Sequence, residues 1–162
     1  MKGTPLPLFG PGPYLVGGGA LITALALVFV NVGWLTSGDL PGLKTPALAL
    51  GAALVAGGVA LWAWAALGCR ISAQIKAGRL VTTGAYGLTR NPIYAAFWLA
   101  FSGMLIGAHN LWLLPLPLVY YLALRAVLEA TEERWLAEQF GDDYRTYCRR
   151  VNRIIPWPRG RK

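Results

Sequence analysis

The stretch GAYGLTRNPIYAAFWLAFSGMLIGA, residues 84–108, decides the fold because it passes from a polar turn directly into a long apolar run. Its apolar part, residues 92–108, carries no charge and is long enough for a helix that crosses the hydrocarbon core of a bilayer. Proline suits the first turn of a helix, since its missing N–H would be unpaired there. We therefore expect a membrane helix that begins at Pro92 and is entered through a polar turn.

The composition of the whole chain agrees with a membrane protein. Of its 162 residues, 56% are hydrophobic and only 14% are charged, whereas a soluble domain has about 25% charged residues. The apolar residues form four blocks, at residues 14–35, 47–68, 92–108 and 111–127. We expect a single all-α integral membrane domain over residues 1–162, with about four transmembrane helices and a C-terminal amphipathic helical tail.

The distribution of charge predicts the orientation. The net charge is +8; eight of the fifteen basic residues lie from Arg134 onward, and four more lie between residues 70 and 90. Basic segments favour the cytoplasmic side, which places the 69–91 loop, the tail and, for an even number of spans, the N-terminus there. This pattern argues against nucleic acid as a partner. The short loops suggest a prokaryotic cytoplasmic membrane, and one histidine with two distant cysteines predicts no metal site.

The polar chemistry is confined to the second half of the chain. The first two apolar blocks hold no ionisable residue in their interiors, so residues 1–68 are expected to be a two-helix scaffold. Arg90 lies at the mouth of the third block, and the fourth block ends in Arg125, Glu129 and two further acids. Arg125 and Glu129 are four residues apart and can pair on one helix face. These residues fit either a solvated helix end or a site for a cationic, hydroxyl-rich ligand.

The tail carries a second helix signal. Gly141 follows the run AEQF and is typical of a helix stop, after which residues 142–150 can form a short amphipathic helix. Its aromatic and basic residues suit the surface of a bilayer. The arginines at positions 145, 149, 150 and 153 are expected either to bind lipid headgroups or to close over a ligand bound at that surface.

Three motifs, taken together, resemble a known family. They are GAYGLTRNPIYAA at residues 84–96, EERWLAEQFGDDYRTY at residues 132–147 and RVNRIIP at residues 150–156. In this order they resemble the isoprenylcysteine carboxyl methyltransferase and phospholipid methyltransferase superfamily, over about half the chain. The chain departs from the family pattern at Asn91, where a histidine is usual, and at Ala96, where a glycine is usual.

The resemblance implies a cytosol-facing site for S-adenosyl-L-methionine within residues 69–162. The cofactor-binding residues that it implies are Arg79, Leu80, Val81, Tyr86, Asn91, Pro92, Ile93, Tyr94, Glu132 and Glu133, with Glu132 preferred over Glu133. The arginine that the family often places four residues before the acidic pair is replaced by Leu128. The candidate catalytic residues are therefore Arg90, Arg125 and Glu129.

The expected function is methyl transfer to a lipophilic small-molecule or lipidated acceptor. Carboxyl O-methylation is favoured, because a carboxylate needs no general base and the single histidine, His109, is expected on the opposite side of the membrane. Phosphatidylethanolamine-type N-methylation is the close rival. An NADPH-dependent sterol-type reductase and a non-enzymatic membrane scaffold remain as alternatives from other classes.

Overall fold

A computed structural model describes residues 11–68 and 79–157, and this part of the chain is mainly helical, without strands. The helices are α1 (Gly12–Asn31), α2 (Lys44–Ala63), α4 (Ala85–Leu88), α5 (Pro92–Gly107), α6 (Leu116–Ala130) and α7 (Glu132–Arg150). The short elements are η1 (Thr36–Gly38), η2 (Pro41–Leu43), η3 (Trp64–Gly68) and η4 (Leu111–Leu113).

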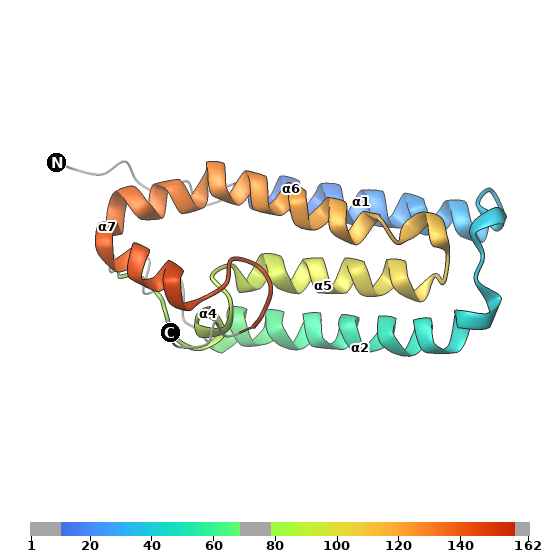
Figure 1. Ribbon diagram of the computed structural model, residues 1–162, viewed down its shortest axis with the longest axis horizontal. Helices are drawn as coiled ribbons and strands as arrows, with labels where there is room; N and C mark the ends of the chain where they lie inside the picture. The colour runs from blue at the N-terminus through green and yellow to red at the C-terminus, as the bar shows by residue number, and fades with distance from the viewer. Residues whose placement is uncertain (1–10, 69–78, 158–162) are drawn as a thin grey trace.

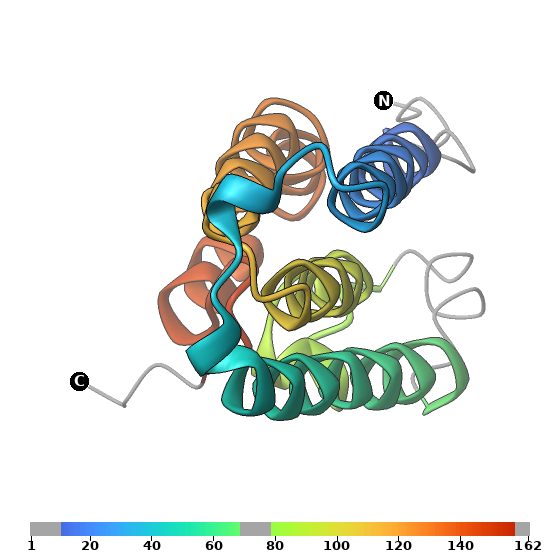
Figure 2. The ribbon, with the colours of Figure 1, turned by 90° about the vertical axis from the view of Figure 1, so that its right-hand side faces the viewer.

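The long helices α1, α2, α5 and α6 run side by side along the longest axis (Figure 1). Viewed end-on, α5 lies between α2 on one side and α1 with α6 on the other (Figure 2). The helices α4 and α7 lie together at one end of this bundle, and the α1–α2 and α5–α6 connections lie at the other end (Figure 1). The second half of the chain therefore gathers its polar elements at one end of an apolar bundle.

Within residues 11–68 and 79–157, three helical segments are long and apolar enough to cross a membrane, namely Gly12–Asn31, Pro41–Leu67 and Leu111–Ala130. The helix that follows Pro92 is also apolar but has 16 residues, or about 24 Å at 1.5 Å per residue. The outward faces of the three long segments carry large apolar side chains such as Leu21, Val59 and Leu118, each more than half exposed. Such faces are typical of helices in contact with lipid. Three of the four predicted blocks thus contain a helix that is long and apolar enough to span a membrane, as expected.

Small residues bring α2 and α5 into close contact. A Cβ atom added to Gly51 would lie 2.5 Å from the carbonyl oxygen of Gly103, and one added to Gly58 would lie 2.6 Å from that of Ala96. Backbones can approach this closely only where side chains are absent, as is common between membrane helices. The pair α2–α5 therefore forms a rigid support for the residues at the start of α5.

Two residues with non-helical backbone angles change the direction of the chain at the polar end. The backbone of Thr131 leaves the helical region (φ −120°, ψ −87°), so α7 begins in a new direction after α6. Gly141 has φ 52°, which bends α7 and confirms the predicted stop at that glycine. The α-helix of the predicted fourth block begins later than expected. Leu111–Leu113 forms a 3₁₀ turn, and Pro115 precedes α6.

Candidate functional site

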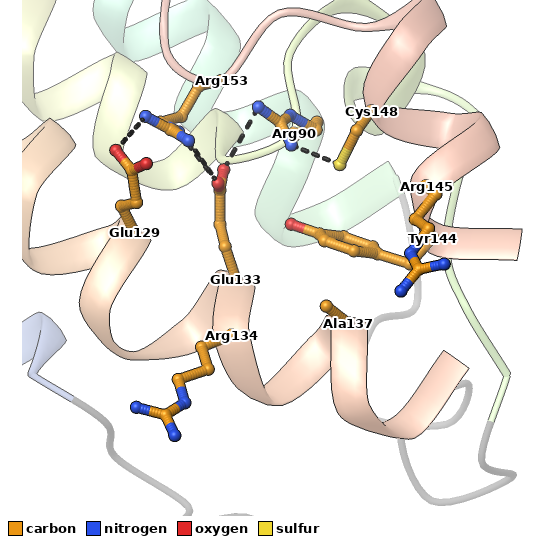
Figure 3. Close-up of a pocket in the computed structure, with 9 residues that line it drawn as sticks. All are labelled: Arg90, Glu129, Glu133, Arg134, Ala137, Tyr144, Arg145, Cys148 and Arg153. Carbon is orange, nitrogen blue, oxygen red and sulfur yellow. Dashed lines mark hydrogen bonds and ion pairs between the residues drawn. The ribbon is translucent and has the colours of Figure 1, made fainter. Parts of the chain in front are cut away.

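The centre of the polar end is a buried carboxylate between two arginines. Glu133 lies 3.4 Å from Nη2 of Arg90 through Oε1, and 2.8 Å from Nη2 of Arg153 through Oε2. Arg153 also donates a hydrogen bond from Nε to the same Oε2 at 2.9 Å. The side chains of Arg90 and Glu133 are only 9% and 8% exposed, so this ion pair is shielded from water (Figure 3).

A second carboxylate extends the cluster toward solvent. Nη1 of Arg153 donates to Oε2 of Glu129 at 2.9 Å, and Nε of Arg125 lies 3.9 Å from that oxygen. The predicted Arg125–Glu129 pair is thus confirmed, although both side chains are more than half exposed. Burial lowers the pKa of Arg153, but hydrogen bonds to the two carboxylates outweigh it and raise the pKa above its ordinary value.

These charges line an open pocket of about 480 Å³ beneath α7. Its lining residues are Arg90, Glu129, Glu133, Arg134, Ala137, Tyr144, Arg145, Cys148 and Arg153 (Figure 3). Arg90 also donates a hydrogen bond to the sulfur of Cys148. Three buried polar atoms in this pocket, Nε of Arg90, Oε1 of Glu133 and Oη of Tyr144, have no hydrogen-bond partner among the described residues. Such atoms are costly unless a ligand or water satisfies them.

The backbone just before α5 holds the C-terminal segment against this pocket. Thr89 donates from Oγ1 toward the carbonyl oxygens of Arg153 (3.0 Å) and Ile154 (3.1 Å). The amide of Arg90 donates to the carbonyl of Asn152 at 2.8 Å, and Nδ2 of Asn91 donates to that of Arg153 at 3.1 Å. This short parallel pairing explains why a residue so late in the chain lies beside Glu133.

Aromatic residues of the second part of α7 pack against the α4 side of the site. Tyr147 donates from Oη to the carbonyl of Tyr86 at 2.6 Å, and Tyr144, Tyr147 and Val151 form a buried cluster to which Leu80 adds its side chain. Burial raises the pKa of both Tyr144 and Tyr147, so both hydroxyls remain neutral donors at physiological pH.

Glu132, the first residue of α7, contacts Tyr94 of α5. The hydroxyl of Tyr94 donates to Oε1 of Glu132 at 2.5 Å. Burial is the largest cause that raises the pKa of Glu132, the hydrogen bond from Tyr94 opposes it, and the neighbouring Glu133 adds to it. The consecutive acids of α7 therefore point at different partners.

An apolar groove of about 190 Å³ lies next to Tyr94, between α1, α5 and α6. Its lining includes Leu15 and Gly19 from α1, Phe97 from α5 and Leu124 from α6. Among the described residues that line it, none carries a formal charge. Tyr94, whose hydroxyl is bonded to Glu132, is one of the residues that line this groove.

The structure separates the residues that the sequence singled out into two groups. Arg90, Glu129 and Glu133 meet in the polar pocket, whereas Tyr94 and Glu132 meet beside the apolar groove. The other candidates do not line the polar pocket. Asn91 and Pro92 are buried, Arg79 is exposed, and Arg125 is half-exposed and pairs with Glu129. The partly buried candidates are Leu80, Val81, Tyr86 and Ile93.

Sequence reasoning gave no individual role to Tyr144, Cys148 or Arg153. The sequence signal for them was the alternation of aromatic and basic residues after Gly141. It was interpreted either as a feature of the membrane surface or, for Arg153 and the other arginines of the tail, as a cover over the bound ligand. Their place in the pocket depends on the pairing of residues 89–91 with residues 152–154.

Comparison with known proteins identifies the class to which this fold and site belong. The model of the phospholipid methyltransferase family matches residues 46–143, which is more than half of the chain. The chain therefore belongs to this family of membrane methyltransferases. The match includes α5, α6 and the first part of α7, with Arg90, Tyr94, Glu132 and Glu133; the second part of α7, the C-terminal segment and α1 lie outside it.

One curated relative adds a particular activity for comparison. Methanethiol S-methyltransferase 1 of Bradyrhizobium diazoefficiens is 35% identical over 83 residues, which cover 50% of this chain and 27% of the relative. The chain thus matches about a quarter of the length of that relative. No solved structure matches the chain significantly.

Proposed function

We propose that the chain is an integral-membrane methyltransferase that binds S-adenosyl-L-methionine in the polar pocket and transfers its methyl group to a lipophilic acceptor. The observation that carries this proposal is a pocket of about 480 Å³ in which Nε of Arg90, Oε1 of Glu133 and Oη of Tyr144 are buried without a hydrogen-bond partner among the described residues, although that Oε1 is ion-paired with Arg90. Family membership supports methyl transfer as the reaction.

The charges of the pocket match those of the proposed cofactor. S-adenosyl-L-methionine carries a carboxylate, an ammonium group and a sulfonium. Arg90 and Arg153 suit the carboxylate, since guanidinium groups bind carboxylates through paired N–H donors. Glu129 and Glu133 suit the two cationic groups. Without a ligand these four side chains neutralise one another, as their ion pairs show.

Of the two consecutive acids, we propose Glu133 as the principal cofactor ligand. The resemblance to the family favoured Glu132, but Glu133 is the one that lines the polar pocket. Tyr86, Asn91, Pro92 and Ile93 would support this site mainly through backbone and packing, as Tyr86 does by accepting the hydrogen bond from Tyr147. Arg79, Leu80 and Val81 would flank it on the side of α4.

The acceptor would reach the reaction from the apolar groove, which Tyr94 helps to line. Methyl transfer from a sulfonium is an in-line displacement, so the main task of the protein is to align donor and acceptor. A carboxylate acceptor remains the expectation from the sequence, and an amine is its rival. The similarity to a methanethiol S-methyltransferase adds a thiol to these acceptor classes.

The proposed orientation places both sites at the cytosolic surface. The end of the bundle formed by α4 and α7 carries most of the described basic residues, including Arg134, Arg149 and Arg150, and basic segments favour the cytosol. In this arrangement the short helix α5 would complete a four-helix membrane domain. A polar cofactor would then enter from water and an apolar acceptor from lipid.

Calorimetric titration of the full chain in detergent with S-adenosylhomocysteine tests the cofactor site. We expect binding that Glu133→Gln weakens by about 10- to 100-fold, the equivalent of one hydrogen bond to a charged group. The matched control is Glu138→Gln, because Glu138 lies on the same helix but is 67% exposed and pairs only with Arg134 among the described residues.

The alternatives give different results in the same titration. Binding of NADPH but not of S-adenosylhomocysteine by folded protein would establish a reductase-type site instead. Binding of neither ligand would leave the polar pocket with a structural role, as in a membrane scaffold.

A further inference from the structure

Cys148 brings a thiol into the polar pocket, where the proposed function gives it no task. It lies on the second part of α7, lines the pocket together with Arg90 and Tyr144, and is only partly buried (Figure 3). We propose that Cys148 is a modification site at which a small anionic disulfide, of the class of oxidised glutathione, forms a mixed disulfide that closes the polar pocket. The effect on ligand binding rests on the proposed function, whereas the modification itself does not.

The thiol is held in a fixed position at the wall of the pocket. Cys148 packs against the buried cluster of Tyr144, Tyr147 and Val151. The guanidinium of Arg90 donates a hydrogen bond to its Sγ atom. Packing and this hydrogen bond keep the sulfur at the pocket wall, where a reagent that enters the pocket can meet it.

The same pocket holds polar groups that a bound molecule would satisfy. Nε of Arg90 and Oη of Tyr144 are buried and have no hydrogen-bond partner among the described residues. The side chain of Arg90 is 9% exposed, and Tyr144 is 3% exposed. Both groups can donate a hydrogen bond, and a carboxylate oxygen accepts such bonds. The arginine that contacts the sulfur therefore also has a free donor for an anionic group.

The charge of the pocket favours an anionic reagent. Four arginines against two glutamates line it, which leaves a formal excess of two positive charges. The side chains of Arg134 and Arg145 are 76% and 72% exposed. Each pairs with an exposed acid on the same helix, and exposed pairs of this kind are weak. Such a field attracts molecules of opposite charge and raises their rate of encounter.

The local charge also suits the reacting form of the thiol. The thiolate is the nucleophile in thiol–disulfide exchange, and a neighbouring cation favours it. Arg90 supplies this cation, although its ion pair with Glu133 offsets part of the effect. An anionic disulfide that is drawn to the arginines thus meets a sulfur that is in contact with one of them.

The proposed reaction is an exchange that needs no further oxidant. The Cys148 thiol gives its proton to water, and the thiolate attacks one sulfur of the disulfide. A new S–S bond forms between Cys148 and that sulfur while the S–S bond of the reagent breaks. The electron pair leaves with the second sulfur, which takes up a proton and becomes a free thiol. Cys148 is oxidised, the departing sulfur is reduced, and an added thiol reverses the exchange.

The attached group would compete with the ligand of the polar pocket. Its carboxylates would lie among the arginines that line the pocket, and its bulk would replace the contact between Arg90 and Sγ of Cys148. The proposed function assigns Arg90 and Arg153 to the carboxylate of the cofactor. The mixed disulfide and a bound S-adenosylhomocysteine should therefore exclude each other.

The test uses the full chain in phosphatidylcholine nanodiscs, with Cys69→Ser so that Cys148 is its single thiol. Oxidised glutathione, which is anionic, and cystamine, which is cationic, are offered separately at low salt. Mass spectrometry of the intact chain follows the adducts, and thermal unfolding shows that each chain is folded. We expect one glutathionyl adduct, which an added thiol removes and which is absent after Cys148→Ala.

Two charge variants test whether the pocket selects the reagent. The ratio of the glutathione rate to the cystamine rate should fall by about 10-fold in Arg134→Gln/Arg145→Gln, because the attraction of the pocket for anions is weakened. Arg149→Gln/Arg150→Gln is the matched control, because these two exposed arginines lie on the same helix but do not line the pocket. The control should change the ratio less. Use of the ratio removes the different intrinsic reactivities of the two disulfides.

Calorimetry with S-adenosylhomocysteine on the same samples completes the test. The adduct should weaken binding by about 10-fold or more, and saturating S-adenosylhomocysteine should slow adduct formation to a similar extent. Absence of the adduct in folded protein, equal effects of the two charge variants, or an adduct that leaves binding unchanged would each overturn the inference. Failure of the unmodified chain to bind S-adenosylhomocysteine would overturn the proposed function instead, while the mass measurement would still decide whether Cys148 is the modification site.

Discussion

The side-chain amide of Asn91 donates a hydrogen bond to the backbone carbonyl of Arg153 at 3.1 Å. It joins the residue immediately before α5 to the segment that brings the Arg153 guanidinium to Glu133. Asn91 occupies the position where the resembled family usually has histidine, and its side chain is used here to hold the chain rather than to line the polar pocket. Replacement of a titratable group by an amide is compatible with that use, because an amide donates at every pH.

Removal of this amide should loosen the C-terminal segment. Asn91→Ala is expected to lower the free energy of unfolding by about 1 kcal/mol, the typical value of one hydrogen bond, and to weaken S-adenosylhomocysteine binding several-fold. Thermal unfolding in detergent and calorimetry measure the two effects. Asn31→Ala is the control, because Asn31 makes a similar bond to Leu27 but at the end of α1. Equal effects of both variants on ligand binding would contradict this role of Asn91.

Truncation of Glu133 should be the most damaging change at the polar end. Glu133→Ala leaves Arg90 buried without its carboxylate, and loss of one partner of a buried ion pair costs about 3–5 kcal/mol. Arg153 retains Glu129. Denaturant unfolding should show a large loss for Glu133→Ala, whereas Glu138→Ala should lose at most about 1 kcal/mol, as for other exposed pairs. Similar losses in the two variants would show that water reaches the Arg90–Glu133 pair.

Two adjacent glycines of α2 should respond differently to the same substitution. A Cβ at Gly58 would lie 2.6 Å from the carbonyl oxygen of Ala96, whereas one at Gly57 would meet nothing within 4 Å. Gly58→Ala should therefore force α2 and α5 apart and cost about 1–3 kcal/mol, as overpacking does. Gly57→Ala should be neutral or stabilising, because alanine favours the helix. Thermal unfolding of both variants checks this, and equal midpoints would contradict the close packing.

The raised pKa of Glu132 predicts a pH dependence of stability. The folded chain holds this proton more tightly than the unfolded chain, in which glutamate has a pKa of about 4.3. The cost of the ionised carboxylate is absent below that pH and grows as the pH rises through the folded-state pKa. The unchanged protein should therefore lose stability relative to Glu132→Gln as the pH rises from about 4 toward neutrality. Paired thermal unfolding curves across this range measure the difference, and a difference of opposite slope would contradict it.

Local patterns were enough to predict the helical body of the molecule. The apolar run after Pro92 ends in the structure at Gly107, one residue earlier than expected, and the helix stop at Gly141 was predicted correctly. Both depend on neighbouring residues alone. The start of α6 was predicted too early, because hydrophobicity does not distinguish the 3₁₀ turn at Leu111–Leu113 from the α-helix that follows Pro115.

The site depends on contacts that local patterns do not contain. Arg90 and Glu133 were identified from their places beside the membrane, but their partner Arg153 comes from a segment that pairs with residues 89–91 across more than 60 positions of sequence. Glu132 and Glu133 were also ranked together as one acidic pair. Only the direction of α7 after Thr131 shows that they have different partners.

That difference has a mechanical consequence. Neighbouring residues on an α-helix project about 100° apart. Glu132 and Glu133 therefore point in different directions from the same helical turn, which follows the non-helical backbone at Thr131. A rotation of the first turn of α7 that draws Glu133 toward a ligand must also move Glu132 relative to Tyr94. Any such rotation would therefore change the Arg90–Glu133 ion pair and the Tyr94–Glu132 hydrogen bond together.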